Sequence, residues 1–147
     1  MVTWIIIVNY RTADLTIDCL HSLSAQVSAM PECRVVVVDN LSGDGSVNRI
    51  EDAIDREDWS AWVSVLPNDR NGGFAYGNNA GIRHALSSQR QPDYFLLLNP
   101  DTIAHPEAVE ACVSFLANNP DIGIVGSRLQ DAEGNFVGSA HNAPTVL

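Results

Sequence analysis

Apolar runs of strand length alternate with amphipathic segments along most of the chain. The apolar runs are Val2–Val8, Arg34–Asp39, Ala61–Leu66, Tyr94–Leu98 and Ile122–Gly126. The segments between them with helical spacing of apolar residues are Asp14–Gln26, Ser46–Asp55, Ala75–Ser88 and Pro106–Asn118. This alternation predicts an α/β fold, with a mostly parallel sheet, right-handed crossovers and helices on both faces. Since Tyr94–Leu98 is apolar throughout, we expect that strand to be buried on both faces.

The pattern changes beyond Gly126. Arg128–Gln130 and Asn135–Gly138 flank an Asp-Ala-Glu-Gly turn, which predicts a hairpin. The length of 147 residues fits one domain, residues 1–147. The last residues carry no stop signal for a domain, so we expect an N-terminal piece of a longer protein.

Composition narrows the class of protein. Hydrophobic residues make up 46% and charged residues 18%, which is typical of a soluble globular chain. The net charge of −10 argues against nucleic-acid binding through a basic surface, although a metal ion or backbone N–H groups could still attract a phosphate. Cys19, Cys33 and Cys112 form no CxxC pair and are expected to be buried thiols of a reducing compartment. No run is long enough to span a bilayer. We therefore expect a cytoplasmic protein, with a peripheral position at the inner face of the membrane left open.

Polar residues follow three of the predicted strands. These tips are Asn9–Thr12, Asp39–Gly45 and Asn99–Thr102, and parallel strands would bring them to one edge of the sheet, where ligands bind in such folds. Asp39 could accept a hydrogen bond from the ring N–H of uracil or thymine, or could cap the following turn. Asp101 could hold a divalent cation together with ligand phosphates, or could simply approach the next helix. Because Asn99 is neutral, the metal site would rest on one carboxylate.

Glycines gather around the start of the third predicted helix. Gly72 and Gly73 permit unusual backbone conformations just before a helix N-terminus, which favours an anion. Gly77 and Gly81 share one helical face, so either a ligand or a tightly packed sheet could lie against them. There is no GxGxxG after the first strand and no GxxxxGK[ST], which argues against a dinucleotide fold and a P-loop.

The histidines show no metal-binding spacing. His21 and His84 are expected on helix surfaces, and His105 lies near Asp101 in the sequence. Trp59 and Trp62 are interpreted as packing residues.

Four motifs occur in order and together resemble glycosyltransferase family 2, in particular its rhamnosyltransferase-like branch. They are Ile5–Arg11, Val35–Ser46, Asn71–Gly81 and Leu96–Thr102, and the resemblance runs from the first strand through Gly138. The resemblance implies a GT-A fold and an inverting transfer of a sugar, with rhamnose favoured, from a dTDP- or UDP-sugar donor. The acceptor would be a hydroxyl of a glycan or lipid-linked molecule in polysaccharide synthesis.

The resemblance also assigns site residues. Val8, Asn9 and Tyr10 would line the base pocket, Asp39 would pair with the pyrimidine N–H, and Arg11 with Asn71–Gly77 would border the diphosphate and ribose. The full nucleotide-binding set is Val8, Asn9, Tyr10, Arg11, Asp39, Asn71, Gly72, Gly73, Gly77, Asn78 and Asn99. Asn99-Pro100-Asp101 matches the family's metal motif, so Asp101 would hold Mg²⁺ or Mn²⁺.

The general base that the family uses has no counterpart here. The carboxylates after the metal tip are Glu107, Glu110, Asp121, Asp131 and Glu133, and none matches the base position. We therefore expect the chain to bind donor better than it transfers sugar, and to self-associate through apolar surface left uncovered. Two alternatives remain: a donor-binding module without turnover, and a nucleotidyltransferase. The latter would need a glycine-rich loop after the first strand, which Asn9–Thr12 lacks.

Overall fold

The computed structural model describes residues 1–138. The chain forms two compact units. The first unit is Met1–Pro106, and the second begins at Glu107. Within the described residues, no helix has both the length and the apolar character needed to cross a bilayer.

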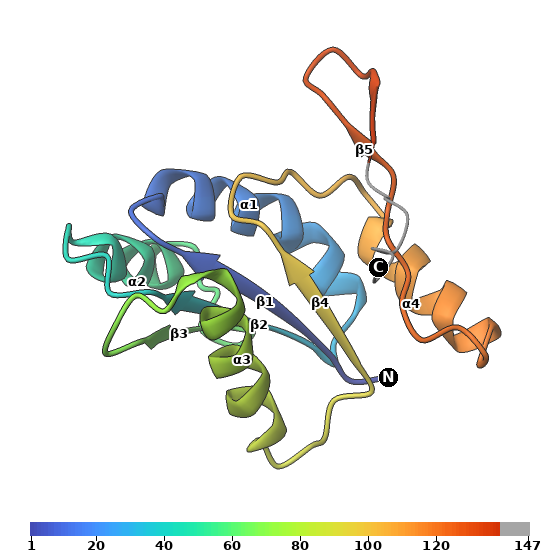
Figure 1. Ribbon diagram of the computed structural model, residues 1–147, viewed down its shortest axis with the longest axis horizontal. Helices are drawn as coiled ribbons and strands as arrows, with labels where there is room; N and C mark the ends of the chain where they lie inside the picture. Colours follow the sequence, from blue (N-terminus) through green and yellow to red (C-terminus); the bar gives the residue numbers. More distant parts are fainter. Residues whose placement is uncertain (139–147) are drawn as a thin grey trace, which may run out of the picture. The chain divides into compact units, whose positions relative to one another are not determined.

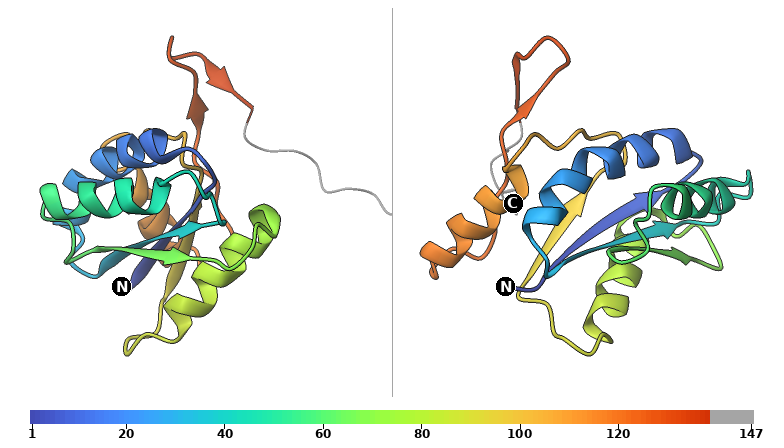
Figure 2. Two further views of the ribbon diagram at one scale, coloured as in Figure 1. Left: turned by 90° about the vertical axis from the view of Figure 1, so that its left-hand side faces the viewer. Right: turned by 180° about the vertical axis from the view of Figure 1, so that it is seen from behind.

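The first unit is a parallel four-stranded sheet between helices (Figure 1). Its strands are β1 (Thr3–Asn9), β2 (Cys33–Asp39), β3 (Val63–Pro67) and β4 (Tyr94–Leu98), in the order β3-β2-β1-β4. Its helices are α1 (Ala13–Ala29), α2 (Ser46–Arg56) and α3 (Gly73–Leu86). Figure 2 shows α1 and α2 on one face of the sheet and α3 on the other. The predicted α/β fold is confirmed.

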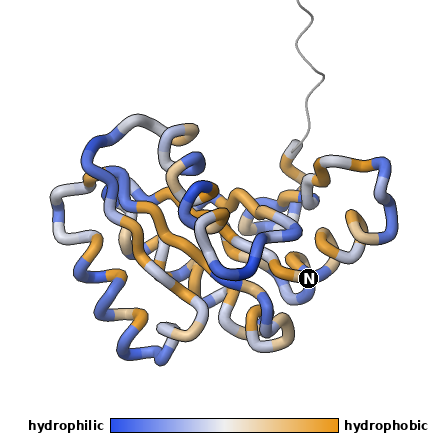
Figure 3. Tube along the Cα trace, turned by 90° about the horizontal axis from the view of Figure 1, so that it is seen from below, coloured by the Kyte–Doolittle hydropathy of each residue, from blue (hydrophilic) through white to orange (hydrophobic). Residues whose placement is uncertain are grey.

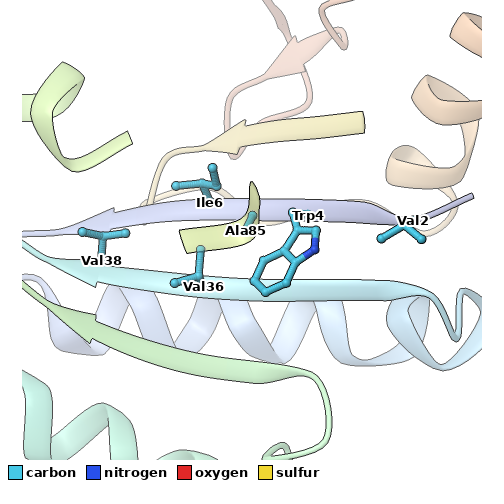
Figure 4. Close-up of a cluster of buried hydrophobic side chains, with 6 residues drawn as sticks. All are labelled: Val2, Trp4, Ile6, Val36, Val38 and Ala85. Atoms are coloured by element: carbon cyan, nitrogen blue, oxygen red, sulfur yellow. The ribbon is translucent and has the colours of Figure 1, made fainter. Parts of the chain in front are cut away.

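The centre of the sheet is built from branched side chains. Ile5–Ile7 and Val35–Val38 are fully or almost fully buried, and the β-branched shape of these residues favours extended backbone. On the α3 face, Trp4 and Ile6 pack with Val36, Val38 and Ala85 (Figure 4). Figure 3 shows hydrophobic stretches of the chain alternating with hydrophilic ones. The buried strands β1 and β2 therefore fix the position of the loops that follow them.

Glycine lets α3 lie close to the sheet. A Cβ atom on Gly81 would stand 2.6 Å from Ile6 Cγ2, and one on Gly77 would stand 2.7 Å from Val8 Cγ1. Of the two interpretations of this glycine face, tight packing on the sheet is the one that the structure shows.

The prediction that β4 is buried on both faces is wrong. Phe95 and Leu97 are 38% and 48% exposed. The register Trp4↔Phe95 and Ile6↔Leu97 places them on the α3 face, but α3 packs mainly over β1 and β2. β4 is the outer strand of the sheet, so within the first unit this face of β4 lies beyond α3.

The second unit contains α4 (Ala108–Asn118) and an antiparallel hairpin of β5 (Leu129–Gln130) and β6 (Phe136–Val137). The hairpin prediction is confirmed. The expected strand at Ile122–Gly126 is wrong: this segment has no regular structure, and Ile124 is 89% exposed. A strand needs a neighbour for its N–H and C=O groups, and no described segment of this unit pairs with 122–126.

Candidate functional site

The three polar tips meet at the carboxyl edge of the sheet, as predicted. Asn9 at the end of β1 is paired with Asp39 at the end of β2. On the other side of β1, Leu98 pairs with Ile7, so Asn99 leaves the sheet at the same edge (Figure 1). Asp39 and Asp101 therefore belong to one rim, with the end of β1 between them.

Asp39 is enclosed by hydrogen-bond donors. Its side chain is only 2% exposed. Asn9 Nδ2 and Ser42 Oγ each donate to Oδ1 at 2.6 Å, and the Ser42 backbone N–H donates to Oδ2 at 2.9 Å. Asp39 thus does cap the following turn. Each carboxylate oxygen offers about two acceptor positions, so Oδ1 is saturated by the described residues and Oδ2 keeps one position.

Asn9 is a buried connector between β1, β2 and α1. Its Nδ2 donates to Asp39, and its Oδ1 accepts from Thr12 Oγ1 at 3.1 Å and from Thr16 Oγ1 at 3.0 Å. The residue is completely buried. Its amide therefore holds the first loop against Asp39, whereas its predicted place in a base pocket stays a prediction.

Tyr10 and Arg11 form the exposed part of the first tip. The Arg11 guanidinium lies 5.2 Å from the Tyr10 ring centroid, and its Nε donates to the Ser42 carbonyl at 3.1 Å. The Arg11 backbone has a φ of 59°, in the left-handed region, where Ser42 Oγ accepts from its N–H at 2.9 Å. Ser42 therefore binds both the loop after β1 and the Asp39 carboxylate.

The start of α3 is tied to two strand ends through Asn40. Asn40 Nδ2 donates to the Gly73 carbonyl at 2.9 Å, and Asn40 Oδ1 accepts from Asn68 Nδ2 at 2.8 Å. Gly73 has a φ of 82°, so the expected unusual backbone is confirmed there, whereas Gly72 has an ordinary φ of −94°. The Gly73 N–H donates to Asn71 Oδ1 at 3.0 Å. This arrangement holds the helix N-terminus at the rim.

Asn78 carries a buried acceptor without a donor. It is 4% exposed, and its Nδ2 donates to the Phe74 carbonyl at 3.0 Å. Among the described residues, nothing donates to its Oδ1. An unsatisfied buried acceptor costs about 1–3 kcal/mol, so a donor from a ligand would be favourable here.

Asp101 is open to solvent, in contrast to Asp39. It is exposed, and no hydrogen bond or ion pair within residues 1–138 uses its carboxylate. Beneath it, Cys19 Sγ donates to the Asn99 carbonyl at 3.8 Å. Burial, and then the charge of Asp101, raise the pKa of the Cys19 thiol to about 12.

The loop that carries Asp101 is supported by α1. The Ala104 N–H donates to Ser22 Oγ at 3.0 Å, and Gln26 Nε2 donates to the Ala104 carbonyl at 3.3 Å. The carboxylate is therefore free while its backbone is held.

The family model for glycosyl transferase family 2 matches residues 4–144, which include this whole rim. The chain belongs to this family. A comparison with curated proteins gives no match.

Solved structures share the GT-A fold of this family 2 chain. The mannosyltransferase PcManGT from Pyrobaculum calidifontis, in complex with GDP-Man and Mn²⁺, is 19% identical with a TM-score of 0.69, covering 80% of this chain and 32% of its own. S. aureus TarS 1–349 is 21% identical with a TM-score of 0.64, covering 82% of this chain and 33% of its own. TarS 1–349 in complex with UDP-GlcNAc gives the same identity and TM-score, covering 82% of this chain and 32% of its own. The chain spans about a third of the length of these structures.

The metal assignment of this family 2 chain rests on Asp101. No group of three or more His, Cys, Asp or Glu side chains within residues 1–138 could hold a metal ion. A single unpartnered carboxylate is a hard oxygen donor that suits Mg²⁺ or Mn²⁺ when ligand phosphates and water complete the shell. The residues present therefore fit a shared site rather than one made by protein alone.

The remaining predicted residues have packing roles or stay untested. Trp59 is buried, with His21 edge-on to its ring at 4.7 Å, and half-buried His84 contacts Trp4 in the same way at 5.7 Å. His105 is exposed. The general base is not identified within the described residues.

Sequence reasoning missed Ser42 and Asn40. Both are buried, and both join loops that are distant in the sequence. Ser42 had a detectable signal, because a serine three residues after a strand-ending aspartate is the spacing of a capped turn. Asn40 had none, since its partners become neighbours only in the folded sheet.

Proposed function

We propose that this family 2 domain binds a nucleoside-diphosphate sugar along the carboxyl edge of its sheet. The nucleobase lies at Asp39 and the diphosphate extends across β1 toward Asp101. The observation that carries this proposal is the pair of unequal carboxylates on one rim, one held as a hydrogen-bond acceptor and one left open. They leave from strands two positions apart, about 10 Å at the usual strand spacing, a span suited to the distance from a nucleobase to its diphosphate.

The surroundings of Asp39 favour a base with a ring N–H. The Asp39 carboxylate already accepts three hydrogen bonds, and its remaining position on Oδ2 can accept one more. Uracil, thymine and guanine offer a ring N–H, whereas cytosine offers a ring acceptor. The fold neighbours complexed with GDP-Man and UDP-GlcNAc carry bases of the first kind, which supports the proposal. Within this class, the sequence resemblance favours dTDP-rhamnose.

The proposed reaction is an inverting transfer to a hydroxyl of a glycan or lipid-linked acceptor. When the nucleoside diphosphate leaves, negative charge grows on its phosphate oxygen. Mg²⁺ or Mn²⁺ bound with Asp101 would supply a Lewis acid for that charge. The Mn²⁺ complex of PcManGT supports this choice of metal. Asp101 would hold the diphosphate end, Arg11 would border it, and Asn78 Oδ1 would accept a hydrogen bond from the donor.

A donor-binding module without turnover is the second candidate. It is favoured by the surroundings of Asp131, one of the carboxylates that follow Asp101 in the sequence. Asp131 accepts hydrogen bonds from the backbone N–H groups of Glu133 and Asn135 and from Asn135 Nδ2. This carboxylate serves the hairpin turn and is a poor candidate for a general base.

Calorimetric titration tests the proposal and separates the two candidates. We expect dTDP, UDP or GDP to bind more tightly with Mn²⁺ than without it, and CDP to bind weakly. Asp101→Ala should remove the metal dependence, whereas Asp52→Ala, a matched exposed carboxylate on α2, should retain it. Release of dTDP from dTDP-rhamnose would indicate transfer, and metal-dependent binding without release would favour the module. Unchanged metal dependence in Asp101→Ala would overturn the metal assignment.

We also propose that copies of the chain self-associate through the uncovered face of β4. Phe95 and Leu97 are exposed there on an outer strand, and exposed apolar patches of this kind favour association.

A further inference from the structure

The single Asn-Gly pair of the sequence lies in the loop between β3 and α3. It consists of Asn71 and Gly72, and both residues are exposed. Glycine has no side chain to shield its nitrogen, and its backbone can adopt conformations that are closed to other residues. The amide carbon of Asn71 and the backbone nitrogen of Gly72 can therefore approach each other.

The two ends of the Asn71 amide are held differently. Its Oδ1 accepts from the Gly73 N–H at 3.0 Å, which folds the side chain toward the backbone that follows. No hydrogen bond within residues 1–138 uses Asn71 Nδ2 or the Gly72 N–H. The carbonyl group is thus polarised by a donor, while its amino group and the neighbouring backbone nitrogen are both free to react.

The other described asparagines lack this combination. The side-chain NH₂ group already donates a hydrogen bond in Asn9, Asn40, Asn68, Asn78, Asn118, Asn119 and Asn135. Asn48 and Asn79 lie in helices, where the next N–H belongs to the helical hydrogen bonds. Asn99 precedes a proline, which has no N–H. Reactivity is therefore expected at Asn71 first.

We propose that Asn71 is a site of spontaneous covalent modification, through a succinimide formed with the backbone nitrogen of Gly72. The Gly72 N–H gives its proton to hydroxide or water, and its nitrogen forms a bond to Asn71 Cγ. The bond from Cγ to Nδ2 breaks, and Nδ2 takes up a proton and leaves as ammonia. Water then opens the ring at Cγ, which gives aspartate, or at the backbone carbonyl carbon, which gives isoaspartate. The net change is the uptake of one water and the release of one ammonia.

The loop after β2 contains the same turn with a carboxylate in place of the amide. Asp44 precedes Gly45, and its Oδ1 accepts from the Ser46 N–H at 3.0 Å. This contact has the same spacing as the one between Asn71 and Gly73. The hydrogen bond from the Ser46 hydroxyl lowers the pKa of Asp44, so this side chain is ionised at neutral pH. An ionised carboxylate resists attack by nitrogen, which makes the Asp44 turn a slow internal reference.

The two products differ in their effect on the start of α3. Aspartate keeps an acceptor for the Gly73 N–H, and its negative charge is favourable near a helix N-terminus. Isoaspartate routes the chain through its β-carbon and so lengthens the backbone beside Gly72, where Tyr76 leaves no room for a side-chain atom. Both products add a negative charge to the rim. The charge would oppose the phosphates of a bound nucleotide, a consequence that rests on the proposed function.

Peptide mapping by mass spectrometry tests the inference on the folded chain, incubated at body temperature and mildly alkaline pH. We expect the peptide with Asn71 to gain the mass difference between asparagine and aspartate and to separate into two chromatographic forms. The rate should rise about 10-fold per pH unit, because the attacking nitrogen must lose its proton. Asn71→Gln should abolish the change, since the longer side chain closes a ring far more slowly. Asn48→Gln, a matched exposed residue on α2, should leave it unaltered.

Three results would overturn the inference. The first is a peptide with Asn71 that keeps its mass throughout the incubation. The second is a change that occurs only in urea, because the folded loop would then protect Asn71. The third is modification of Asn48 or Asn79 as fast as that of Asn71, because the loop geometry would then play no part.

The consequence for binding is measured with Asn71→Asp, which reproduces one charged product. We expect this variant to bind dTDP roughly 5-fold more weakly than the unmodified chain, and to bind thymidine equally well, since only the phosphates meet the new charge. Equal affinity for dTDP would overturn this consequence. If the unmodified chain binds no nucleotide, the proposed function fails, whereas the mass change at Asn71 still decides whether the modification occurs.

Discussion

Two aspartates on the same rim have opposite surroundings. Asp39 is almost completely buried and receives hydrogen bonds from Asn9 and from both the hydroxyl and the N–H of Ser42. Asp101 is exposed and has no hydrogen-bonding partner within residues 1–138, although α1 holds its loop. The first carboxylate is part of the folded structure, and the second has no structural task within the described chain.

The difference extends to the strands that carry them. β2 lies inside the sheet, under α3, and its tip is tied through Asn40 to the start of that helix. β4 is an outer strand whose Phe95 and Leu97 are uncovered. The comparison teaches that two tasks are separated on this rim: the Asp39 carboxylate holds the fold together, whereas the Asp101 carboxylate stays open to solvent.

Replacing Asp39 and Asp101 in turn by alanine should give the largest difference in stability between two variants. We expect Asp39→Ala to lower the free energy of unfolding by about 3 kcal/mol, because three buried donors lose their acceptor. Asp101→Ala should change it by less than about 0.5 kcal/mol, as for an ordinary surface substitution. Urea unfolding followed by tryptophan fluorescence measures both values.

Equal losses in the two variants would contradict the comparison. Asp39→Asn is a useful intermediate, since its amide oxygen can still accept from Ser42 while its NH₂ group opposes Asn9 Nδ2. It should therefore fall between the unmodified chain and the alanine variant.

The close packing of α3 on β1 and β2 provides a second contrast. Gly81→Ala would place a Cβ atom 2.6 Å from Ile6 Cγ2, and we expect a loss of about 2 kcal/mol from overpacking. Gly123→Ala is the control, because nothing lies within 4 Å of its Cβ position and its φ is not in the left-handed region. Its stability should stay the same or rise slightly. A harmless Gly81→Ala would show that α3 can shift away from the sheet.

Much of the first unit could be predicted from the sequence because its signals are local. The branched runs at Ile5–Ile7 and Val35–Val38 specify buried strands on their own, and helices between them force parallel pairing. Parallel pairing then brings the polar tips to one edge. The family match and the fold comparisons confirm the predicted family and the predicted α/β fold.

The errors arose where the environment of a segment depends on distant neighbours. Tyr94–Leu98 has the composition of a fully buried strand, yet its burial depends on what lies beside it, and within the first unit α3 packs mainly over β1 and β2. Ile122–Gly126 has strand-forming residues but no pairing partner among the described residues of its unit. The connecting roles of Ser42 and Asn40 were missed for the same reason, since their partners belong to other loops.

The uncovered face of β4 leads to a third prediction. Leu97→Ser should weaken self-association roughly 10-fold, because an exposed leucine that becomes buried between copies contributes about 1.5 kcal/mol. Leu15→Ser on α1 is the matched control, since Leu15 is 46% exposed and Leu97 is 48% exposed. Sedimentation velocity over a range of concentrations measures the effect. Equal weakening by both variants would indicate general stickiness and not a surface on β4.

Asp44 supplies the smallest effect and an intermediate between the two aspartates. It is exposed like Asp101, but its Oδ1 accepts from the Ser46 N–H at 3.0 Å and from Ser46 Oγ at 2.6 Å, and the side-chain hydrogen bond is the main cause of its lowered pKa. A lowered folded-state pKa stabilises the fold above the unfolded pKa, and this contribution is lost as the pH falls through the folded pKa. Asp44→Ala should therefore lower the urea midpoint slightly at pH 7, and the difference from the unmodified chain should shrink as the pH falls to about 3. A difference in urea midpoint that stays constant over this range would mean that the charge of Asp44 does not stabilise the fold. In that respect Asp44 would resemble Asp101.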